Sequence, residues 1–327
     1  MNKNQIKQNS LKAWLLAARP KTLSGAAVPV LIGIALAYSD ISSEFGAEYF
    51  NWVPAVLCLL FAFVMQINAN FINDFFDYAN GNDDTERRLG PLRACTQGWV
   101  SVDAMKRAIA LTTVIACVVG LPLIWFGGLE MILVGVVCVV FCFLYTTHLS
   151  YMGLGDLLVL VFFGIVPVCI TYYVIYCSVR YPYLAEDYVP HYCTWQVFLA
   201  SVACGLVVDG LLVVNNYRDR ENDREDGKLT LVVRLGARNS RRLFLALGIV
   251  ACALGVVFWM NGHLLAFVLP VLFLVLHVYT WLKLKGARPL SESRAAWAAT
   301  MNNCLGEAAR NILVYGLCVV IGLLILL

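Results

Sequence analysis

The sequence has few charged residues, and this scarcity excludes an ordinary soluble protein. Only 14% of its 327 residues are Asp, Glu, Lys or Arg, whereas 61% are hydrophobic. A soluble chain carries about a quarter charged residues. The mean hydropathy of +0.75 therefore indicates that most of the chain lies in a lipid bilayer.

Two patterns that bind softer metals are also missing. The chain has only four histidines, scattered along its length, and its twelve cysteines include no C-x-x-C pair. These absences exclude a local His or Cys metal site. We interpret the cysteines as small apolar fillers of helix interfaces. Cys177 and Cys193, which flank a predicted outer loop, are the one pair for which we consider a disulfide.

Apolar runs long enough to cross a membrane recur along the whole chain. About 20 apolar residues in a helix span the hydrocarbon core. The N-terminal run is no convincing cleavable signal, because Arg19-Pro20-Lys21 abuts it and further spans follow. We predict an all-α polytopic membrane protein, a single domain over 1–327, with nine spans at about 23–39, 52–76, 104–121, 128–147, 155–177, 196–217, 241–260, 263–284 and 308–327.

The basic residues predict the orientation of these spans. With the N-terminus inside, 23 of the 24 Lys and Arg residues fall in inner segments, at 3–21, 87–107, 218–242 and 283–310. Only Arg180 lies in an outer loop. This asymmetry follows the positive-inside rule. We therefore expect the N-terminus and the inner loops on the cytoplasmic side.

Two acid-rich motifs stand at the inner ends of the second and sixth spans. The motif-bearing helices are predicted at about 52–83 and 196–223. In each, an Asn precedes an Asp by four residues: Asn73 and Asp77, then Asn215 and Asp219. Residues four apart share one face of a helix. The second face also carries Asp223, and the two faces can therefore meet in one pocket, with Asn216 and Asp83 close to the motifs in the sequence.

The chemistry of this pocket favours magnesium and a phosphorylated substrate. Carboxylate and amide oxygens are hard ligands that suit Mg²⁺, whose remaining positions are filled by water and phosphate. Basic residues in the same loops, Arg93, Arg218 and Lys228, can bind diphosphate oxygens. We predict that Asp77, Asp219 and Asn73 are functional, because polar groups at apolar helix ends are costly. More exposed acids such as Glu225 are interpreted as solvated.

Several further residues near the predicted pocket have open roles. Asp209 lies inside the sixth span, where it can be either a substrate contact or a polar anchor between helices. Asp156 and Tyr145 are placed to reach the mouth of the pocket. Tyr145 and Tyr217 offer aromatic faces, which stabilise cations.

These motifs resemble the UbiA superfamily of intramembrane prenyltransferases, and within it the 1,4-dihydroxy-2-naphthoate branch, MenA. The resemblance rests on an Asn-Asp-x-x-Asp motif in the second span and an Asp-x-x-x-Asp motif in the sixth. The acid that follows Asp77 comes six residues later, at Asp83, where the common superfamily motif has it four later, and this spacing is typical of the naphthoate branch. Further matching stretches are Arg19-Pro20-Lys21-Thr22-Leu23, Gly90-Pro91-Leu92-Arg93, Leu154-Gly155-Asp156, Thr171-Tyr172-Tyr173 and the residues from Asn215 to Gly236.

The resemblance implies Mg²⁺-dependent transfer of a polyprenyl group from its diphosphate to dihydroxynaphthoate. The ring loses its carboxylate as CO₂, and the product is demethylmenaquinone. The implied location is the bacterial cytoplasmic membrane. The implied metal-diphosphate residues are Asn73, Asp77 and Asp83 on one side and Asp219 and Asp223 on the other, with Asp74 in support. The implied substrate residues are Arg19, Lys21, Arg93, Tyr145, Asn216, Arg218 and Lys228.

Two alternatives remain open at this point. The same chemistry can act on another acceptor, such as 4-hydroxybenzoate. An ion-coupled transporter can also hold a pair of acidic motifs, although transporters place coupling ions near the bilayer midplane and these acids lie at the inner helix ends.

Overall fold

The computed structural model describes residues 6–81, 88–145, 149, 151–179, 193–287 and 293–325. Within these ranges every regular element is helical, which confirms the predicted fold class. The elements are α1 (Leu11–Ala18), η2 (Pro20–Thr22), α2 (Leu23–Glu44), η3 (Ala47–Tyr49), α3 (Trp52–Ala79), α4 (Val102–Gly120), α5 (Leu123–Gly127), α6 (Glu130–Leu144), α7 (Gly155–Leu160), η5 (Val161–Ile165), α8 (Val166–Cys177), α9 (Trp195–Glu225), α10 (Leu231–Leu254), α11 (Val256–Met260), α12 (Leu264–Val268), α13 (Val271–Gly286) and α14 (Arg294–Leu324).

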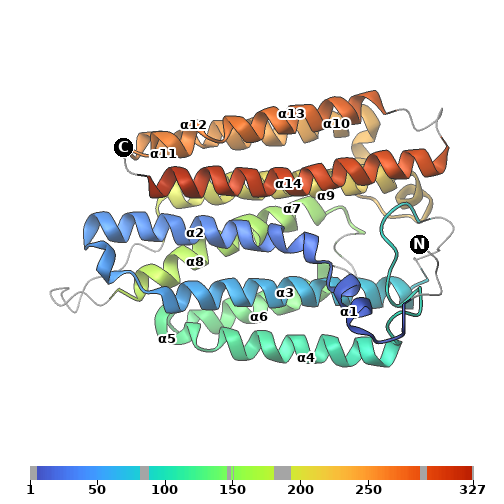
Figure 1. Ribbon diagram of the computed structural model, residues 1–327, viewed down its shortest axis with the longest axis horizontal. Coiled ribbons are helices and arrows are strands. Elements are labelled where there is room, and N and C mark those ends of the chain that lie inside the picture. Colours follow the sequence, from blue (N-terminus) through green and yellow to red (C-terminus); the bar gives the residue numbers. More distant parts are fainter. Residues whose placement is uncertain are drawn as a thin grey trace.

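The long helices lie side by side as one elongated bundle (Figure 1). Helices α10, α13 and α14 form one flank and α3, α4 and α6 the other, with α2, α8 and α9 between them. Large apolar side chains point outward: Trp125 is 80% exposed and Leu133 67% exposed. A surface so apolar is costly in water and suited to lipid. The chain is an integral membrane protein.

Within the described ranges, eight helical segments are long and apolar enough to cross a membrane. They cover eight of the nine predicted spans, and the predicted span 155–177 matches Gly155–Cys177 to the residue. The fourth predicted span, 128–147, is represented by α6, which is only 15 residues long. The described length is about 22 Å of helix, less than a core about 30 Å thick, and positions 146–148 lie outside the described residues. The predicted count of nine is therefore not confirmed.

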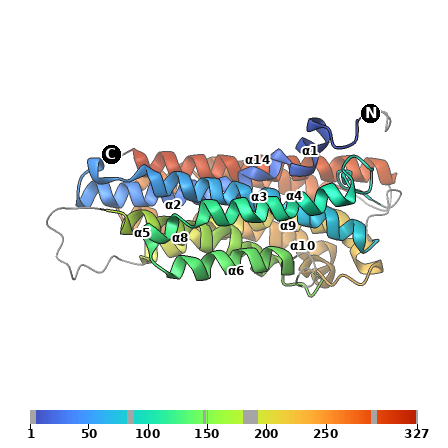
Figure 2. The same ribbon diagram turned by 90° about the horizontal axis from the view of Figure 1, so that it is seen from below.

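The first and last helices of the chain differ from the sequence prediction. The last helix begins at Arg294, 14 residues before the predicted start of the last span at 308, with Ser293 as its N-cap. Its first turns are polar enough to resemble a loop, but Trp297 and Met301 are buried against α9 and α10. Helix α1, which was not predicted, packs on α3 at the edge of the bundle (Figure 2). Arg19, in the left-handed conformation, separates α1 from the following turn.

A close helix contact lies between η5 and α9. A Cβ atom on Gly164 would stand 2.6 Å from the Cα of Gly205, so neither glycine can be replaced without moving a helix. The segment Val161–Ile165 is a π-helical turn followed by Pro167, and proline removes a helical hydrogen bond. Glycines and a π-turn thus bring this helix and α9 together.

Cys193 lies against Cys169 in α8, and not against the Cys177 considered from the sequence. The two Sγ atoms, of Cys193 and Cys169, are 3.4 Å apart, and both thiols are free.

Candidate functional site

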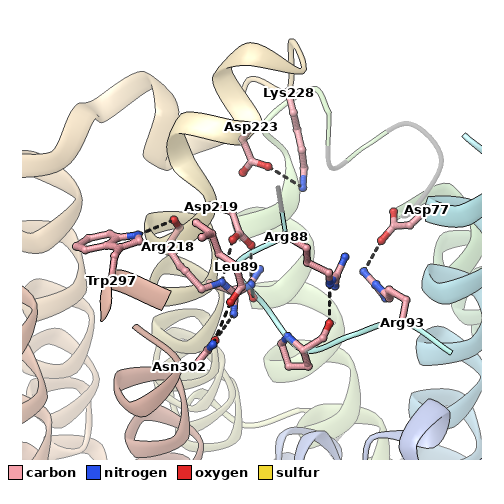
Figure 3. Close-up of polar contacts among 12 residues, drawn as sticks. Asp77, Arg88, Leu89, Arg93, Arg218, Asp219, Asp223, Lys228, Trp297 and Asn302 are labelled. Carbon is pink, nitrogen blue, oxygen red and sulfur yellow. Dashed lines mark hydrogen bonds and ion pairs between the residues drawn. The ribbon is translucent and has the colours of Figure 1, made fainter. Parts of the chain in front are cut away.

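The two acidic motifs come together at one end of the bundle. The last turns of α3 and α9 carry them, and they lie at the end near the N-terminus (Figure 1). In the close-up, Asp77 on α3 faces the space that Asp219 and Asp223 on α9 face from the other side (Figure 3). The segment 88–93 runs between them. The two helix ends therefore converge, as the sequence predicts.

On the α3 side, Asp77 forms an ion pair with Arg93. The Asp77 side chain keeps 25% of its surface exposed, whereas Arg93 keeps 11%. Asn73, one turn earlier on the same face, is half-buried. Asp77 is therefore held in place by a cation and still accessible to a ligand.

Asp74 points away from this space and anchors the segment that carries Arg93. Its side chain is 1% exposed. It accepts hydrogen bonds from the backbone N–H groups of Ala94 (2.8 Å) and Cys95 (2.9 Å). Asp74 thus supports the site by fixing the position of Arg93 beside Asp77.

We expect Asp74→Ala to destabilise the protein by about 2–6 kcal/mol, because two buried N–H groups each lose an acceptor worth about 1–3 kcal/mol. Prenyl transfer by the folded fraction should fall as well, since Arg93 is no longer held. Thermal unfolding in detergent micelles measures the first effect. Asp103→Ala, at an exposed acid in the first turn of α4, is the control and should be nearly neutral. Equal stability of the two variants would contradict the anchoring role.

On the α9 side, Arg218 organises the second motif. It forms two hydrogen bonds with Asp219, at 2.8 and 2.6 Å, and is itself buried. Further contacts run to Asn215 (2.9 Å) and to Asn302 on α14 (3.0 Å). Trp297 donates to the Arg218 carbonyl at 3.2 Å. Arg218, predicted as a diphosphate ligand, is here chiefly a holder of Asp219.

Asn302 and Trp297 are the site residues that the sequence analysis missed. Asn302 also donates to the carbonyl of Leu89 at 3.0 Å, so it joins α9 to the segment 88–93. Both residues lie in a stretch before 308 that was predicted to be an inner loop, so they were not expected to face the site. The pair Asn302-Asn303 within a run of small and apolar residues was the available signal.

Asp223 and Lys228 form an ion pair close to the ring of Tyr151. The Lys228 Nζ lies 3.7 Å from Asp223 Oδ1, and Asp223 Oδ2 is buried with no partner among the described residues. The pKa of Tyr151 is raised, first by burial and then by the negative charges of Asp77, Asp223 and Asp226. One tyrosine thus lies within electrostatic reach of acids from both helices.

Buried guanidinium groups supply the positive side of the site. Arg93 Nε and Nη1, together with Arg19 Nη2, are buried and have no acceptor in the described part of the chain. Arg19 lies within electrostatic reach of Arg93 and Asp77. Buried donors without partners are costly. They are therefore suited to an anionic ligand.

A small cavity of about 20 Å³, with room for about one water molecule, adjoins the α9 motif. Three predicted residues line it, Tyr145, Asn216 and Lys228, together with Asp156. Tyr217 does not: it is buried, with its ring 5.9 Å from that of Trp297. Lys21 is exposed on η2. Asp83 lies outside the described residues.

The residues present fit a hard divalent cation held jointly with a ligand. Among the described residues, no three His, Cys, Asp or Glu side chains stand close enough to hold an ion unaided. Mg²⁺ is usually bound through one or two carboxylates plus substrate phosphate and water. Asp77, Asp219 and the unpartnered oxygen of Asp223 provide such carboxylates on two facing helices.

Comparison with known sequences identifies a family. The model of the UbiA prenyltransferase family matches residues 26–304. The 1,4-dihydroxy-2-naphthoate octaprenyltransferase of Escherichia coli K12 is 34% identical over 306 residues, which cover 91% of this chain and 87% of that protein.

Comparison with solved structures identifies the same fold. A UbiA homolog from Aeropyrum pernix K1 superposes with a TM-score of 0.64 at 16% identity, covering 91% of this chain and 97% of that one. A UbiA homolog from Archaeoglobus fulgidus, bound to GPP and Mg²⁺, superposes with a TM-score of 0.57 at 16% identity over 94% and 99% of the two chains.

Proposed function

This chain belongs to the UbiA prenyltransferase family, and we propose that it transfers a polyprenyl group from polyprenyl diphosphate to 1,4-dihydroxy-2-naphthoate. The acceptor loses its carboxylate as CO₂, and the product is the prenylated hydroquinone, which becomes demethylmenaquinone on two-electron oxidation. The 1,4-dihydroxy-2-naphthoate octaprenyltransferase of Escherichia coli K12 is 34% identical over 91% of this chain, and this similarity supports the naphthoate acceptor over other acceptors of the family. Membership of the family leaves no support for the transporter alternative.

The proposal rests on one observation: carboxylates and buried arginine nitrogens that lack acceptors among the described residues lie together at one end of the bundle. Asp77 and Asp219 are accessible carboxylates on facing helices. Arg93 and Arg19 present buried donors without acceptors. A diphosphate offers oxygens to such donors and binds carboxylates through a cation.

Each group has a role in the transfer. Arg93 and Lys228 bind diphosphate oxygens and stabilise the charge that grows as the allylic C–O bond breaks. Asp77, Asp219 and Asp223, with Asn73 in support, would hold Mg²⁺, and the bound metal would neutralise charge on the leaving diphosphate. Tyr145 and Asn216, in the adjoining cavity, orient the acceptor. The lipid-embedded bundle excludes water, which would otherwise capture the allylic cation.

We place the protein in the bacterial cytoplasmic membrane with its N-terminus and both acidic motifs facing the cytoplasm. The distribution of Lys and Arg supports this orientation. Both substrates have charged heads, and the donor also has a lipid tail. A site at the inner helix ends receives the heads from the cytoplasm and the tail from the bilayer.

Prenyl transfer by the purified protein tests the acceptor. With polyprenyl diphosphate and Mg²⁺, we expect prenylated product and CO₂ from 1,4-dihydroxy-2-naphthoate. We expect at least about 100-fold lower kcat/KM with 4-hydroxybenzoate, because polar groups shaped for one acceptor are left unpaired by another. Radiolabelled donor and product chromatography measure both reactions. Preference for 4-hydroxybenzoate would overturn the acceptor assignment.

A further inference from the structure

Two acids outside the diphosphate site lie opposite each other between α7 and α9. Close contacts fix the register of these antiparallel helices. A Cβ atom on Gly205 would stand 3.2 Å from the Cα of Leu160, and one on Gly155 would stand 3.5 Å from the side chain of Leu212. Moving from the first contact to the second brings Asp156 opposite Asp209. The two carboxyl groups are close enough for their negative charges to repel each other.

Both acids are left without full hydrogen bonding. Asp209 is 5% exposed, and its Oδ1 is buried without a partner among the described residues. Asp156 Oδ1 is in the same condition. A buried carboxyl oxygen that lacks a donor is costly, and an ionisable residue inside a membrane helix is commonly functional. The pair therefore requires an explanation beyond packing.

The pair adjoins the cavity next to the diphosphate site. Asp156 lines that cavity together with Tyr145 and Asn216. Tyr145 lies within electrostatic reach of Asp156, Asp209 and Asp77. Asp209 is ten residues before Asp219 on α9, about 15 Å deeper along the helix. The aromatic ring of an acceptor bound deeper in the bundle than the diphosphate would therefore lie near Asp156 and Asp209.

Other titratable groups near the pair are few and already engaged. Across the cavity, Lys228 contacts Asp223. On α13, His277 packs near Gly210, and its Nε2 is hydrogen-bonded to the carbonyl of Phe244 at 2.7 Å. Neither removes the unpaired oxygens of Asp156 and Asp209.

We propose that Asp209 and Asp156 form the proton-accepting wall of the acceptor site: they bind the phenolic hydroxyl next to the carboxylated ring carbon and take its proton. This inference rests on the proposed function. A carboxylate at this position has the right chemistry, because a phenolate is far more nucleophilic at the adjacent carbon than a phenol. Two facing carboxyl groups hold one proton between them, so the pair can accept a proton and return it.

The proton and electron balance of the step closes without a further reactant. The O–H bond breaks and its proton passes to the carboxylate. The ring carbon that bears the carboxylate bonds to the allylic carbon of the donor, and the allylic C–O bond breaks to release diphosphate. The C–CO₂ bond then breaks, its electron pair restores the aromatic ring, and the oxygen regains its proton from the carboxyl pair.

Prenyl transfer by Asp209→Asn tests this inference. We expect kcat to fall about 100-fold, the usual size of a lost general base, with an unchanged KM for the donor and recovery in Asp209→Glu. Asp156→Asn should behave in the same way. An acceptor carrying an electron-withdrawing fluorine, whose hydroxyl is more acidic, should react with Asp209→Asn with a smaller loss than the parent acceptor does. A merely structural acid does not predict that rescue.

Asp40→Asn is the matched control and should keep wild-type kcat, since Asp40 lies in α2 and accepts a hydrogen bond from Tyr172 at 2.8 Å. Wild-type turnover in both Asp209→Asn and Asp156→Asn would overturn this inference alone. So would equal losses with parent and fluorinated acceptors. Absence of any naphthoate prenylation by the wild-type protein would overturn the proposed function and this inference with it.

Discussion

Replacing either Asp77 or Asp219 with Asn is expected to lower turnover on the order of 10³-fold. Each substitution removes a carboxylate from one of the two facing helix ends, and an amide neither neutralises nor firmly holds Mg²⁺. The folded protein should survive, because each acid is partly exposed and an Asn side chain keeps an oxygen that accepts a hydrogen bond from the buried arginine. Initial rates with saturating donor and acceptor measure the effect.

Glu225→Gln is the matched control for these variants. It makes the same change of charge at an exposed position at the end of the same helix, α9, and it should retain wild-type turnover. Insertion and folding are checked by gel filtration and thermal unfolding of each variant. Near-normal rates for Asp77→Asn or Asp219→Asn at ordinary Mg²⁺ would remove the basis of the site.

Removing divalent cations is expected to abolish transfer, with a loss of roughly 10³-fold or more, since a bound metal supplies several kcal/mol of charge stabilisation. Chelation with EDTA followed by titration of Mg²⁺ measures it. The physical reason is that carboxylates alone repel a diphosphate. Activity should return fully with Mg²⁺.

The same titration separates metal binding from other effects of mutation. Asp223→Asn should need more Mg²⁺ for half-maximal rate, because it replaces the carboxylate whose Oδ2 is buried without a partner among the described residues with a neutral amide. Glu225→Gln should titrate like the wild type. A wild-type rate that persists after chelation would contradict a metal-held diphosphate.

Much of the fold was predictable because a bilayer imposes a simple rule on sequence. Spans must be apolar for about 20 residues, so Gly155–Cys177 was predicted to the residue. The convergence of Asp77 and Asp219 was predictable for a related reason, since acids at the ends of apolar helices are rare and costly. In both cases a strong energetic penalty leaves its mark in the sequence.

The parts that escaped prediction depend on contacts between distant residues. The roles of Asp74 and Arg218 follow from partners at Ala94, Cys95 and Asn302, which no local pattern reveals. The early start of α14 escaped for a similar reason, because its mostly exposed first turns are held by the buried side chains of Trp297 and Met301 and not by their own hydropathy. The register that places Asp156 opposite Asp209 depends on glycine contacts between α9 and the helix that begins with α7.

The hydrogen bond from Asn302 to the carbonyl of Leu89 joins residues 213 positions apart in the chain. During synthesis, the first acidic motif is inserted long before Asn302 leaves the ribosome. The reactive end of the bundle is therefore completed only when the final helix has entered the membrane. Nascent chains that stop short of it carry both motifs but lack the hydrogen bonds through which α14 joins α9 to the segment 88–93.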